Sequence, residues 1–378
     1  MPDPTATDIT GSIRRHLAQV MDPELRLPIT QLGMVGDVAV DGEGVADVTV
    51  KLTIAACPKQ QTITDDVTAA AVRAEGVSTA RVHLDVMTPE ERARLKEDLR
   101  GEGGKINHFA QPDSLTRVYA VASGKGGVGK SSVTVNLACA MAADGLKVGI
   151  VDADVHGFSV PGLMGITDTP TRLDEMILPP VAHGVKTISI GMFVEGNQAV
   201  AWRGPMLHRA VEQFLTDVHF GDLDVLLLDL PPGTGDIAIS VAQLLPGSEL
   251  LVVTTPQAAA SGIAERAGGL STQTEQKVAG VIENMAPMVL PDGSSLDLFG
   301  SGGGQVVADR LTEDLGAEVP LLGSVPLDMD LRSAGDAGDP VVLSAPESPA
   351  GSALRDIASA LAHRPRGIAD RSLPFGPA

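Results

Sequence analysis

The glycine-rich stretch SGKGGVGKSS, at residues 123–132, constrains the fold of this 378-residue chain more than any other segment. It satisfies the G-x-x-x-x-G-K-[ST] pattern of nucleotide triphosphatases through Gly124, Gly129, Lys130 and Ser131. It also satisfies the G-x-G-x-x-G pattern of dinucleotide-binding folds through Gly124, Gly126 and Gly129. The apolar run RVYAVAS precedes the stretch and a helical pattern follows it. Both patterns therefore predict a phosphate-binding loop between a strand and a helix.

Two features favour a triphosphate. Lys130 supplies an ammonium group for the β- and γ-phosphates and Ser131 a hydroxyl for Mg²⁺, whereas a dinucleotide has no use for that cation. The apolar run DVLLLD ends in Asp229, and a carboxylate placed there beside a phosphate loop commonly holds Mg²⁺ through water. We therefore expect ATP and Mg²⁺ as cofactors. The expected nucleotide contacts in the loop are Gly124, Lys125, Gly126, Gly127, Val128, Gly129, Lys130, Ser131 and Ser132.

Further carboxylates are expected at the same edge of the sheet. The strand KVGIVDAD carries Asp152 and Asp154 to its carboxyl end, where ligands bind in folds of this type. Asp154 is a candidate for orienting the attacking water, and Asp152 for a position behind the direct ligands of Mg²⁺. A helix cap or a turn is the alternative for each. Asp236, in PPGTGD, is a candidate sensor of the γ-phosphate, with a cap on the next helix as its alternative.

Short apolar runs recur from about residue 117 onward, between helical or loop segments. Runs without polar alternation are typical of parallel strands covered on both faces. Their alternation with helices predicts an α/β fold, a P-loop NTPase with a mostly parallel, doubly wound sheet. The runs are Val118–Ala122, Val148–Val151, Val185–Ile190, Val225–Leu228, Leu250–Val253, Val278–Ile282 and Leu321–Val325.

A small α+β domain is expected before this sheet. Its predicted elements are a helix at 7–21, strands at 35–40 and 45–54, a helix at 59–74 and a strand at 77–86. Thr88 as N-cap, with Glu91 closing a capping box, starts another helix, whose dense charge predicts a solvated spacer. The predicted division is a small domain at 1–87, charged helix and glycine-rich linker at 88–114, P-loop ATPase domain at 115–363 and flexible tail at 364–378.

The composition excludes several classes of function. There are 28 basic and 48 acidic residues, a net charge of −20, which argues against nonspecific binding to nucleic acid or to an anionic membrane. The amino terminus lacks the pattern of a signal peptide, and no apolar run is long enough to span a membrane. The two cysteines, Cys57 and Cys139, exclude a disulfide scaffold and predict a cytoplasmic protein. The histidines are scattered, without the spacing of a zinc site.

Lys125, directly after the first glycine of the loop, calls for a separate explanation. The spacing K-G-G-x-G-K resembles the deviant Walker A loop of the MinD, ParA and nitrogenase iron protein class. In that class the extra lysine crosses a dimer interface and neutralises charge at the partner's nucleotide, which implies catalytic roles for Lys125 and Lys130. A solvated loop lysine is the alternative. The resemblance predicts that Lys125→Ala keeps ATP binding but loses most turnover.

Longer segments resemble the Mrp/ApbC family of iron–sulfur cluster carrier ATPases. They are DADVHGFSVPGLMG, WRGPM, LDVLLLDLPPGTGD, TTPQ and GVIENM, and VMDPEL, LGMVGDV and LTIAACP resemble the small domain often fused to that family. The resemblance covers about residues 7–345. It implies a homodimer that hydrolyses ATP slowly and carries an iron–sulfur cluster, with apoprotein clients and iron–sulfur assembly proteins as partners. It also implies that Asn284 contacts adenine; a polar residue closing a strand is the alternative.

The chain departs from that family at the metal site. Most members carry a C-x-x-C pair after ENM, but the segment here reads ENMAPMVLPDGSS, and the ligand positions fall near Leu290 to Gly293. Cys139 is expected in the core. Cys57 precedes Pro58, and a helix N-terminus there would favour its thiolate, so Cys57 is a candidate iron–sulfur or thiol ligand. A structural role is the alternative.

Three functions compete at this point. The first is an ATPase that assists assembly or transfer of iron–sulfur clusters. The second is an ATP-dependent adaptor that binds clients without a cluster of its own. The third is a MinD- or ParA-like positioning ATPase, but SALRDIASALAH has little basic charge and is predicted to be a packing helix rather than a membrane-targeting one. Trp202 and Arg203, in WRGPM, are expected to cover the nucleotide, to contact another subunit or to pack in the core.

Overall fold

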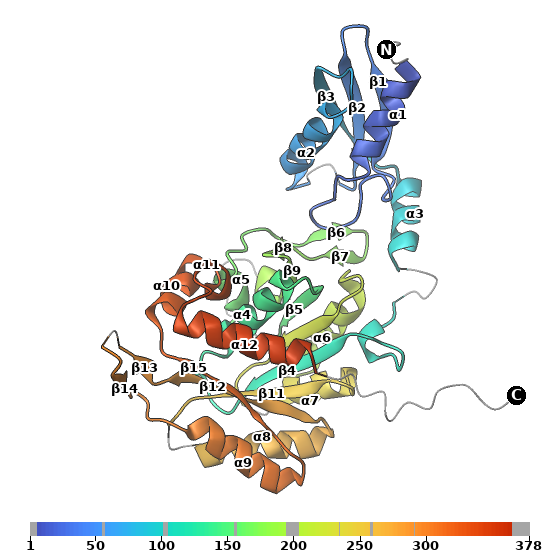
Figure 1. The fold of residues 1–378 in the computed structure, drawn as a ribbon. Coiled ribbons are helices and arrows are strands. Elements are labelled where there is room, and N and C mark those ends of the chain that lie inside the picture. The colour runs from blue at the N-terminus through green and yellow to red at the C-terminus, as the bar shows by residue number, and fades with distance from the viewer. Residues whose placement is uncertain are drawn as a thin grey trace, which may run out of the picture.

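The computed structural model describes residues 6–54, 57–100, 105–154, 157–193, 204–233, 235–257, 260–290 and 292–364. The predictions for Trp202 and Arg203, and for the tail after residue 364, lie outside these ranges. Figure 1 shows a small N-terminal part above a larger α/β part, with α3 (Pro89–Arg100) leading from one to the other. We call them the small part and the large part.

A three-stranded sheet and two helices form the small part, as the sequence predicted. The sheet has the order β1–β2–β3, with β1 antiparallel and β3 parallel to β2. Alternate residues of β2 are buried against the helices, which gives the sheet one apolar face. The elements are α1 (Ala6–Leu17), β1 (Val35–Val40), β2 (Val45–Leu52), α2 (Gln60–Val72) and β3 (Thr79–Val86).

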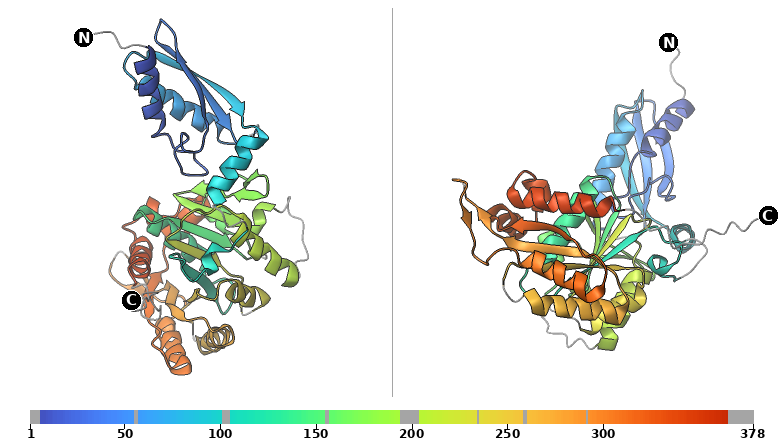
Figure 2. Two further views of the ribbon diagram at one scale, coloured as in Figure 1. Left: turned by 90° about the vertical axis from the view of Figure 1, so that its right-hand side faces the viewer. Right: turned by 60° about the horizontal axis from the view of Figure 1, so that its bottom comes forward.

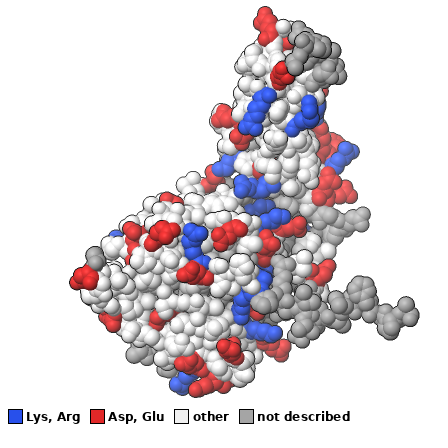
Figure 3. Space-filling model, viewed as in Figure 1, with Lys and Arg blue, Asp and Glu red and all other residues white. Residues whose placement is uncertain are grey.

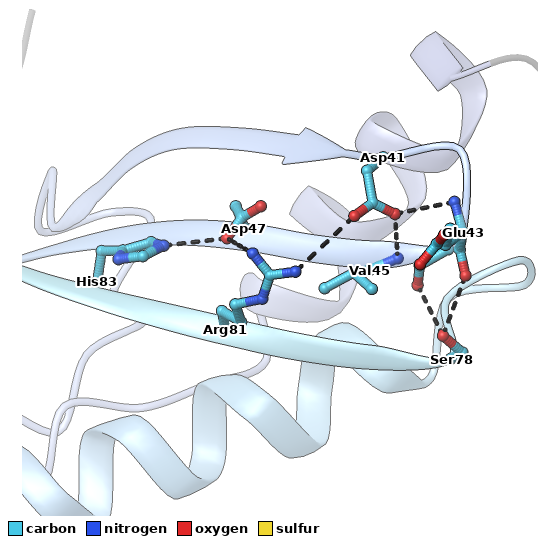
Figure 4. Close-up of polar contacts among 8 residues, drawn as sticks. Asp41, Glu43, Val45, Asp47, Ser78, Arg81 and His83 are labelled. Atoms are coloured by element: carbon cyan, nitrogen blue, oxygen red, sulfur yellow. Dashed lines mark hydrogen bonds and ion pairs between the residues drawn. The ribbon is translucent and has the colours of Figure 1, made fainter.

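The other face of this small sheet carries a network of charged side chains (Figure 4). His83 Nε2 lies 3.0 Å and Arg81 Nη1 3.6 Å from Asp47 Oδ1. Asp41 closes the predicted turn between β1 and β2, because its carboxylate accepts the N–H groups of Val45 and Glu43. These hydrogen bonds, with that of Val45 first, lower the pKa of Asp41. The network is a solvated face that links β2 with β3, and the hydrogen bonds of Asp41 hold the turn between β1 and β2.

The helix α3 begins with the predicted capping box. Glu91 Oε2 accepts the N–H of Thr88 at 2.9 Å, and Thr88 Oγ1 accepts the N–H of Glu91 at 3.2 Å. The prediction of a solvated spacer is wrong for one face of α3, because Leu95 is buried in the hydrophobic core of the small part. Because charged residues dominate the sequence of α3, its pattern does not indicate that one apolar side chain is buried.

The described half of the predicted linker also packs on the large part. It contains the 3-10 helix η1 (His108–Ala110), and the ring of Phe109 lies 5.8 Å from that of Phe220. Asn107 Nδ2 donates to the carbonyl of Leu244 at 2.8 Å. Residues 105–114 are therefore attached to the large part through Asn107 and Phe109 rather than acting as a free spacer.

An eight-stranded sheet organises the large part, in the order β15–β12–β11–β4–β10–β5–β9–β8. All strands run parallel except β8, which pairs antiparallel with β9. Every apolar run singled out in the sequence is a strand of this sheet, which confirms the predicted fold. The strands are β4 (Arg117–Ser123), β5 (Val148–Asp152), β8 (Val181–Ala182), β9 (Val185–Ser189), β10 (Val225–Asp229), β11 (Glu249–Thr254), β12 (Val278–Ala286) and β15 (Leu321–Pro326).

Helices cover both faces of the large sheet (Figures 1 and 2). One face packs against α4 (Lys130–Ala143), α5 (Val160–Leu163), α10 (Met329–Ala337), α11 (Val341–Ser344) and α12 (Pro349–Ala362). The other packs against α6 (Gly204–Asp217), α7 (Asp236–Leu244), α8 (Ala260–Thr274) and α9 (Gly303–Leu315). Leu354, Ile357 and Leu361 are buried on α12, so the prediction of a packing helix is confirmed.

Short elements outside the large sheet were not predicted. One hairpin pairs β6 (Thr171–Leu173) with β7 (Met176–Leu178), and a second pairs β13 (Met288–Val289) with β14 (Ser295–Leu296). The 3-10 helix η2 (Ile190–Phe193) follows β9. Strands of two or three residues are too short to show a period in the sequence. No helix in the described ranges combines the length and the apolar character needed to cross a membrane.

Candidate nucleotide-binding site

The glycine-rich loop lies between β4 and α4, as predicted. Gly127 and Gly129 adopt left-handed backbone conformations, with φ of 75° and 77°. At Gly129 a Cβ atom would lie 2.2 Å from Asn284 Nδ2. Any side chain at this position would clash with Asn284, so the loop requires glycine there. The loop thus brings the amino-terminal end of α4 to the carboxyl edge of the sheet, where backbone N–H groups favour a bound phosphate.

Lys130 and Asp229 form a buried ion pair at the start of α4. Lys130 Nζ lies 2.6 Å from Asp229 Oδ1, and the two side chains are only 6% and 0% exposed. Despite this short distance, Nζ has no well-directed hydrogen bond to any of the described atoms. A buried ammonium group with unused donors fits an anionic ligand such as a triphosphate.

Two hydroxyl groups connect α4 to the same carboxylate. Ser131 Oγ donates to Asp229 Oδ2 at 2.5 Å, and Thr134 Oγ1 donates to Asp229 Oδ1 at 3.0 Å. A serine hydroxyl beside a carboxylate is a set of hard oxygen donors that suits Mg²⁺, whose other ligands are usually water and phosphate. Thr134 was not predicted, although its spacing of one helical turn from Lys130 signals it.

Asp152 lies behind this pair, at the end of β5. It is fully buried, accepts hydrogen bonds from Ser189 Oγ at 2.9 Å and from the N–H of Asp154 at 3.2 Å, and pairs in register with Asp229. Burial, with the nearby charge of Asp229, raises the pKa of Asp152 to about 7. Its predicted role behind the direct ligands of Mg²⁺ stays a prediction. Ser189 was missed, although it is a polar residue ending an apolar strand.

The other predicted residues have distinct positions. Asp154 is buried two residues beyond Asp152, at the same edge of the sheet. Asp236 is the first residue of α7, and Gly235, rather than Asp236, occupies the cap position of that helix. Lys125 lies apart from the buried pair, and its Nζ donates to the side-chain carbonyl of Gln257 in the same chain. Lys125 is half-buried, and its contact with Gln257 lies in an exposed position, so the predicted role of Lys125 stays a prediction.

Asn284 supports the loop from β12. Its Nδ2 donates to the carbonyl of Val128 at 2.8 Å, and the side chain is buried. This hydrogen bond links the end of β12 to the turn of the glycine-rich loop. The sequence predicted an adenine contact, with a strand-closing polar residue as the alternative, and did not foresee this brace. The adenine contact stays a prediction.

Cys57 lies between β2 and α2, in the position predicted from Pro58. The expectation that a helix end favours its thiolate is wrong, because Cys57 is only 6% exposed and burial raises the pKa of its thiol. The charges of Glu24 and Asp22 raise it further. Cys139 is fully buried, with a pKa raised by burial to about 12, which confirms its predicted place in the core.

A complete iron–sulfur site is absent from the described ranges. They hold no group of three or more His, Cys, Asp or Glu side chains able to bind a metal ion. Of the segment expected to carry ligands, the described residues Leu290, Asp292 and Gly293 lie between β13 and β14. Asp292 is engaged there with Ser294, whose hydroxyl and N–H donate to its carboxylate, and these bonds lower the pKa of Asp292. The residues present do not fit the family's four-thiolate arrangement.

Comparison with known families identifies both parts of the chain. Residues 114–362 match the ParA family described as NUBPL iron-transfer P-loop NTPase. Residues 11–84 match the family described as iron–sulfur cluster assembly protein. The matched ranges correspond to the large part and to most of the small part.

Individual relatives extend over nearly the whole chain. A protein of Mycobacterium tuberculosis strain H37Rv, named iron–sulfur cluster carrier protein, is 58% identical over 371 residues, which cover 98% of this chain and 97% of the relative. A protein of Deinococcus radiodurans with the same name is 42% identical and covers 94% and 95%. These relatives agree with the resemblance stated from the sequence.

Solved structures resemble the large part. A nucleotide-binding protein from Archaeoglobus fulgidus, described in complex with ADP, is 36% identical, with a TM-score of 0.50 over 59% of this chain and 86% of that chain. The MinD protein of Pyrococcus horikoshii, described as complexed with Mg-ADP, is 24% identical, with a TM-score of 0.48 over 65% and 96%. From its matches along both parts, the chain belongs to the ParA/NUBPL family of iron-transfer P-loop NTPases, with a fused iron–sulfur cluster assembly domain.

Proposed function

We propose that this protein is an ATP-binding and ATP-hydrolysing carrier that helps to assemble iron–sulfur clusters or to transfer them to apoproteins. The observation that carries the proposal is the contact of Lys130 and Ser131 with Asp229 at the carboxyl ends of two neighbouring buried strands. Relatives named iron–sulfur cluster carrier protein align with 98% of the chain, which supports the cargo. A 36%-identical structure described as an ADP complex supports the nucleotide.

The phosphate end of ATP is held by the glycine-rich loop and the buried pair. Backbone N–H groups of Gly124–Ser132 bind phosphate oxygens, and Lys130 turns from Asp229 toward the β- and γ-phosphates. Asp229 and Ser131 hold Mg²⁺, which neutralises phosphate charge when bound. When Mg-ATP binds, the Lys130–Asp229 contact is replaced by two others. Lys130 then pairs with phosphate and Asp229 with Mg²⁺, so each buried charge keeps an opposite charge beside it.

Other side chains complete the ATP step. Asp154 orients the attacking water, and Asp152, behind the direct ligands of Mg²⁺, holds the end of β5 in place through Ser189. Asp236 senses the γ-phosphate from the start of α7, and Asn284 contacts adenine from the end of β12. Each of these roles uses a residue at the carboxyl edge of the large sheet.

The working form in this proposal is a homodimer. Lys125 of each protomer leaves Gln257 of its own chain and reaches the phosphates bound by the other protomer. A charge delivered from a second chain couples hydrolysis to assembly of the dimer. Hydrolysis then depends on dimer formation, because the site is complete only in the dimer.

The proposed cargo is an iron–sulfur cluster for which this chain supplies only some of the ligands. The sequence holds only two cysteines, and Cys139 is locked in the core, so Cys57 is the thiol assigned to the cargo. A homodimer then offers two such thiols, and clients or assembly proteins supply the remaining ligands. Both cysteines are free thiols, which suits the proposed cytoplasmic location.

Anaerobic reconstitution with iron and sulfide tests the cargo. The wild-type protein should become coloured, contain iron and sulfide, and activate an apoprotein acceptor faster with Mg-ATP than without it. Cys57→Ala should stay colourless, and Cys139→Ala is the matched control that should load normally. A wild-type protein that loads no iron, or a Cys57→Ala variant that loads and transfers as well as wild type, contradicts the assignment.

An adaptor without its own cluster is the second candidate. It is favoured by the missing C-x-x-C pair and by the burial that raises the pKa of Cys57. Colourless protein after reconstitution, together with ATP-dependent binding to a client, would select it. A positioning ATPase has less support, since the apolar residues of α12 are committed to the core and the net charge is −20. We therefore propose neither a nucleic acid nor a membrane as a partner.

A further inference from the structure

We infer that the β6–β7 hairpin of the large part is a removable cover over the Cys57 face of the small part. In the docked arrangement the hairpin completes the core around Cys57, and the thiol becomes reachable only when the two parts separate. This inference concerns the contact between the parts and does not depend on ATP binding or on a cluster.

The apolar side of the hairpin belongs to the core of the small part. Leu173, Met176 and Leu178 are buried and lie in the same hydrophobic cluster as Cys57. Arg172, between Thr171 and Leu173 in β6, is exposed, whereas both of its neighbours are buried. The hairpin therefore presents an apolar face to the small part. Figure 1 places β6 and β7 below the small part, next to the lower end of α3. Separation of the parts would therefore open the cluster that buries the thiol.

Two polar contacts connect the hairpin segment to the immediate neighbours of Cys57. Thr171 Oγ1 donates to Glu24 Oε1 at 2.6 Å, and both groups are buried. Lys59 Nζ lies 2.5 Å from Asp168 Oδ2. Glu24 and Lys59 are also two of the charges that act on the pKa of Cys57, in opposite directions. The large part thus contacts two charged residues that act on the thiol of Cys57.

The turn that carries Glu24 is itself fixed within the small part. Asp22 Oδ1 accepts the N–H groups of Glu24 at 3.0 Å and of Leu25 at 2.7 Å. The partner of the hairpin is therefore a preformed surface rather than a loose loop. The two parts can separate without breaking these hydrogen bonds, because the donors and the acceptor all belong to the small part.

The charged side chains at the rim of the contact are partly exposed to water. The side chains of Lys59 and Asp168 are 30% and 38% exposed, and those of Lys96 and Asp174, 3.5 Å apart, are 25% and 42% exposed. Figure 3 shows basic and acidic side chains meeting where the small part adjoins the large part. Partly exposed ion pairs stabilise a contact weakly, and α3 tethers the parts when they separate. The contact thus combines an apolar centre with a weak rim, which suits reversible docking.

Alkylation of Cys57 tests the inference directly. In a Cys139→Ala background, Cys57 is the one remaining thiol of the chain. Its reaction with iodoacetamide is followed by mass spectrometry at about pH 8, without nucleotide. Lys59→Asp and Asp168→Lys should each speed labelling by about fivefold, because opening of the contact limits the reaction and each variant replaces an attraction by a repulsion. Lys59→Asp also removes a charge that lowers the thiol pKa, so faster labelling there cannot arise from a more acidic thiol.

The charge-swapped double variant separates undocking from misfolding. Lys59→Asp combined with Asp168→Lys restores the ion pair in reverse and should return labelling to near the parent rate. Asp309→Lys on α9 makes the same charge change at an exposed position and should leave the rate unchanged. Single variants that label as slowly as the parent overturn the inference. A double variant that labels as fast as the singles overturns it as well.

Discussion

At the level of single residues, the buried pair of Lys130 and Asp229 lies at the centre of the candidate site. Both charges are removed from water, so each depends on the other until a nucleotide binds. Their positions at a strand end and a helix start were predictable, since phosphate chemistry fixes the residue types. The brace from Asn284 and the burial of Cys57 were not, because they depend on contacts between distant segments.

Lys130→Met should destabilise the nucleotide-free protein. The variant leaves Asp229 buried without its cation, which costs about 3–5 kcal/mol in comparable buried pairs. Adding Asp229→Asn removes the stranded charge and should recover part of this loss. Urea unfolding followed by circular dichroism measures both effects. A Lys130→Met protein as stable as wild type would show that the pair does not stabilise the nucleotide-free protein.

Lys186, on β9, predicts a pH dependence of stability. Its Nζ is buried against the carbonyl of Phe220 at 3.0 Å, and burial lowers the pKa of Lys186 from 10.5 to about 8. Between these values the unfolded chain binds more protons than the folded chain, so stability rises with pH across that window. The expected gain is roughly 2–3 kcal/mol.

Lys186→Met should remove this rise. Urea unfolding at several values from about pH 7.5 to about 10 compares the slopes of wild type and variant, and their difference cancels the contribution of other titrating groups. The lost hydrogen bond to Phe220 shifts the variant curve by a constant and leaves the slope unaffected. Parallel curves for the two proteins would show that Lys186 titrates normally.

At the level of elements, the helices and strands that could be predicted were those long enough to show a pattern in the sequence. The apolar runs gave each parallel strand of the large sheet, and the capping box gave the start of α3. The hairpins β6–β7 and β13–β14 escaped prediction, because strands of two or three residues have no measurable period. The buried contact of Leu95 escaped for a related reason, since one apolar residue cannot define a helix face.

Thr88→Ala should weaken α3 through loss of the capping box. The side-chain hydrogen bond to the N–H of Glu91 disappears, at a cost of about 1 kcal/mol. The effect reaches the small part because Leu95 packs in its core. Thr88→Ser retains the hydroxyl and is the matched control. Urea unfolding should give wild type and Thr88→Ser similar free energies of unfolding, and Thr88→Ala a lower one. Equal values for all three proteins would mean that the cap does not contribute to stability.

At the level of the whole molecule, the β6–β7 hairpin of the large part packs into the core of the small part (Figure 1). The candidate nucleotide site lies at the carboxyl edge of the large sheet. The family and the fold followed from the sequence, because the loop, PPGTGD and WRGPM are specific segments. The contact between the parts did not, since it pairs Glu24 with Thr171 across a sequence distance that no local pattern reports.

Lys125→Ala tests the proposed dimer. The variant should bind ATP as wild type does but lose most of its turnover, because a charge at the partner's phosphates is missing. Mixing Lys125→Ala with Lys130→Ala protein should recover part of the activity, since each mixed dimer regains one complete site. Full activity of Lys125→Ala alone, or no recovery in the mixture, would rule out delivery of this lysine from a second chain.

Calorimetric titration of Mg-ATP into the nucleotide-free protein tests the central claim most directly. The account predicts saturable binding at one site per protomer in wild type, and loss of that binding in Lys130→Ala. Wild-type protein that binds no ATP, or Lys130→Ala protein that binds it with unchanged affinity, would contradict the account.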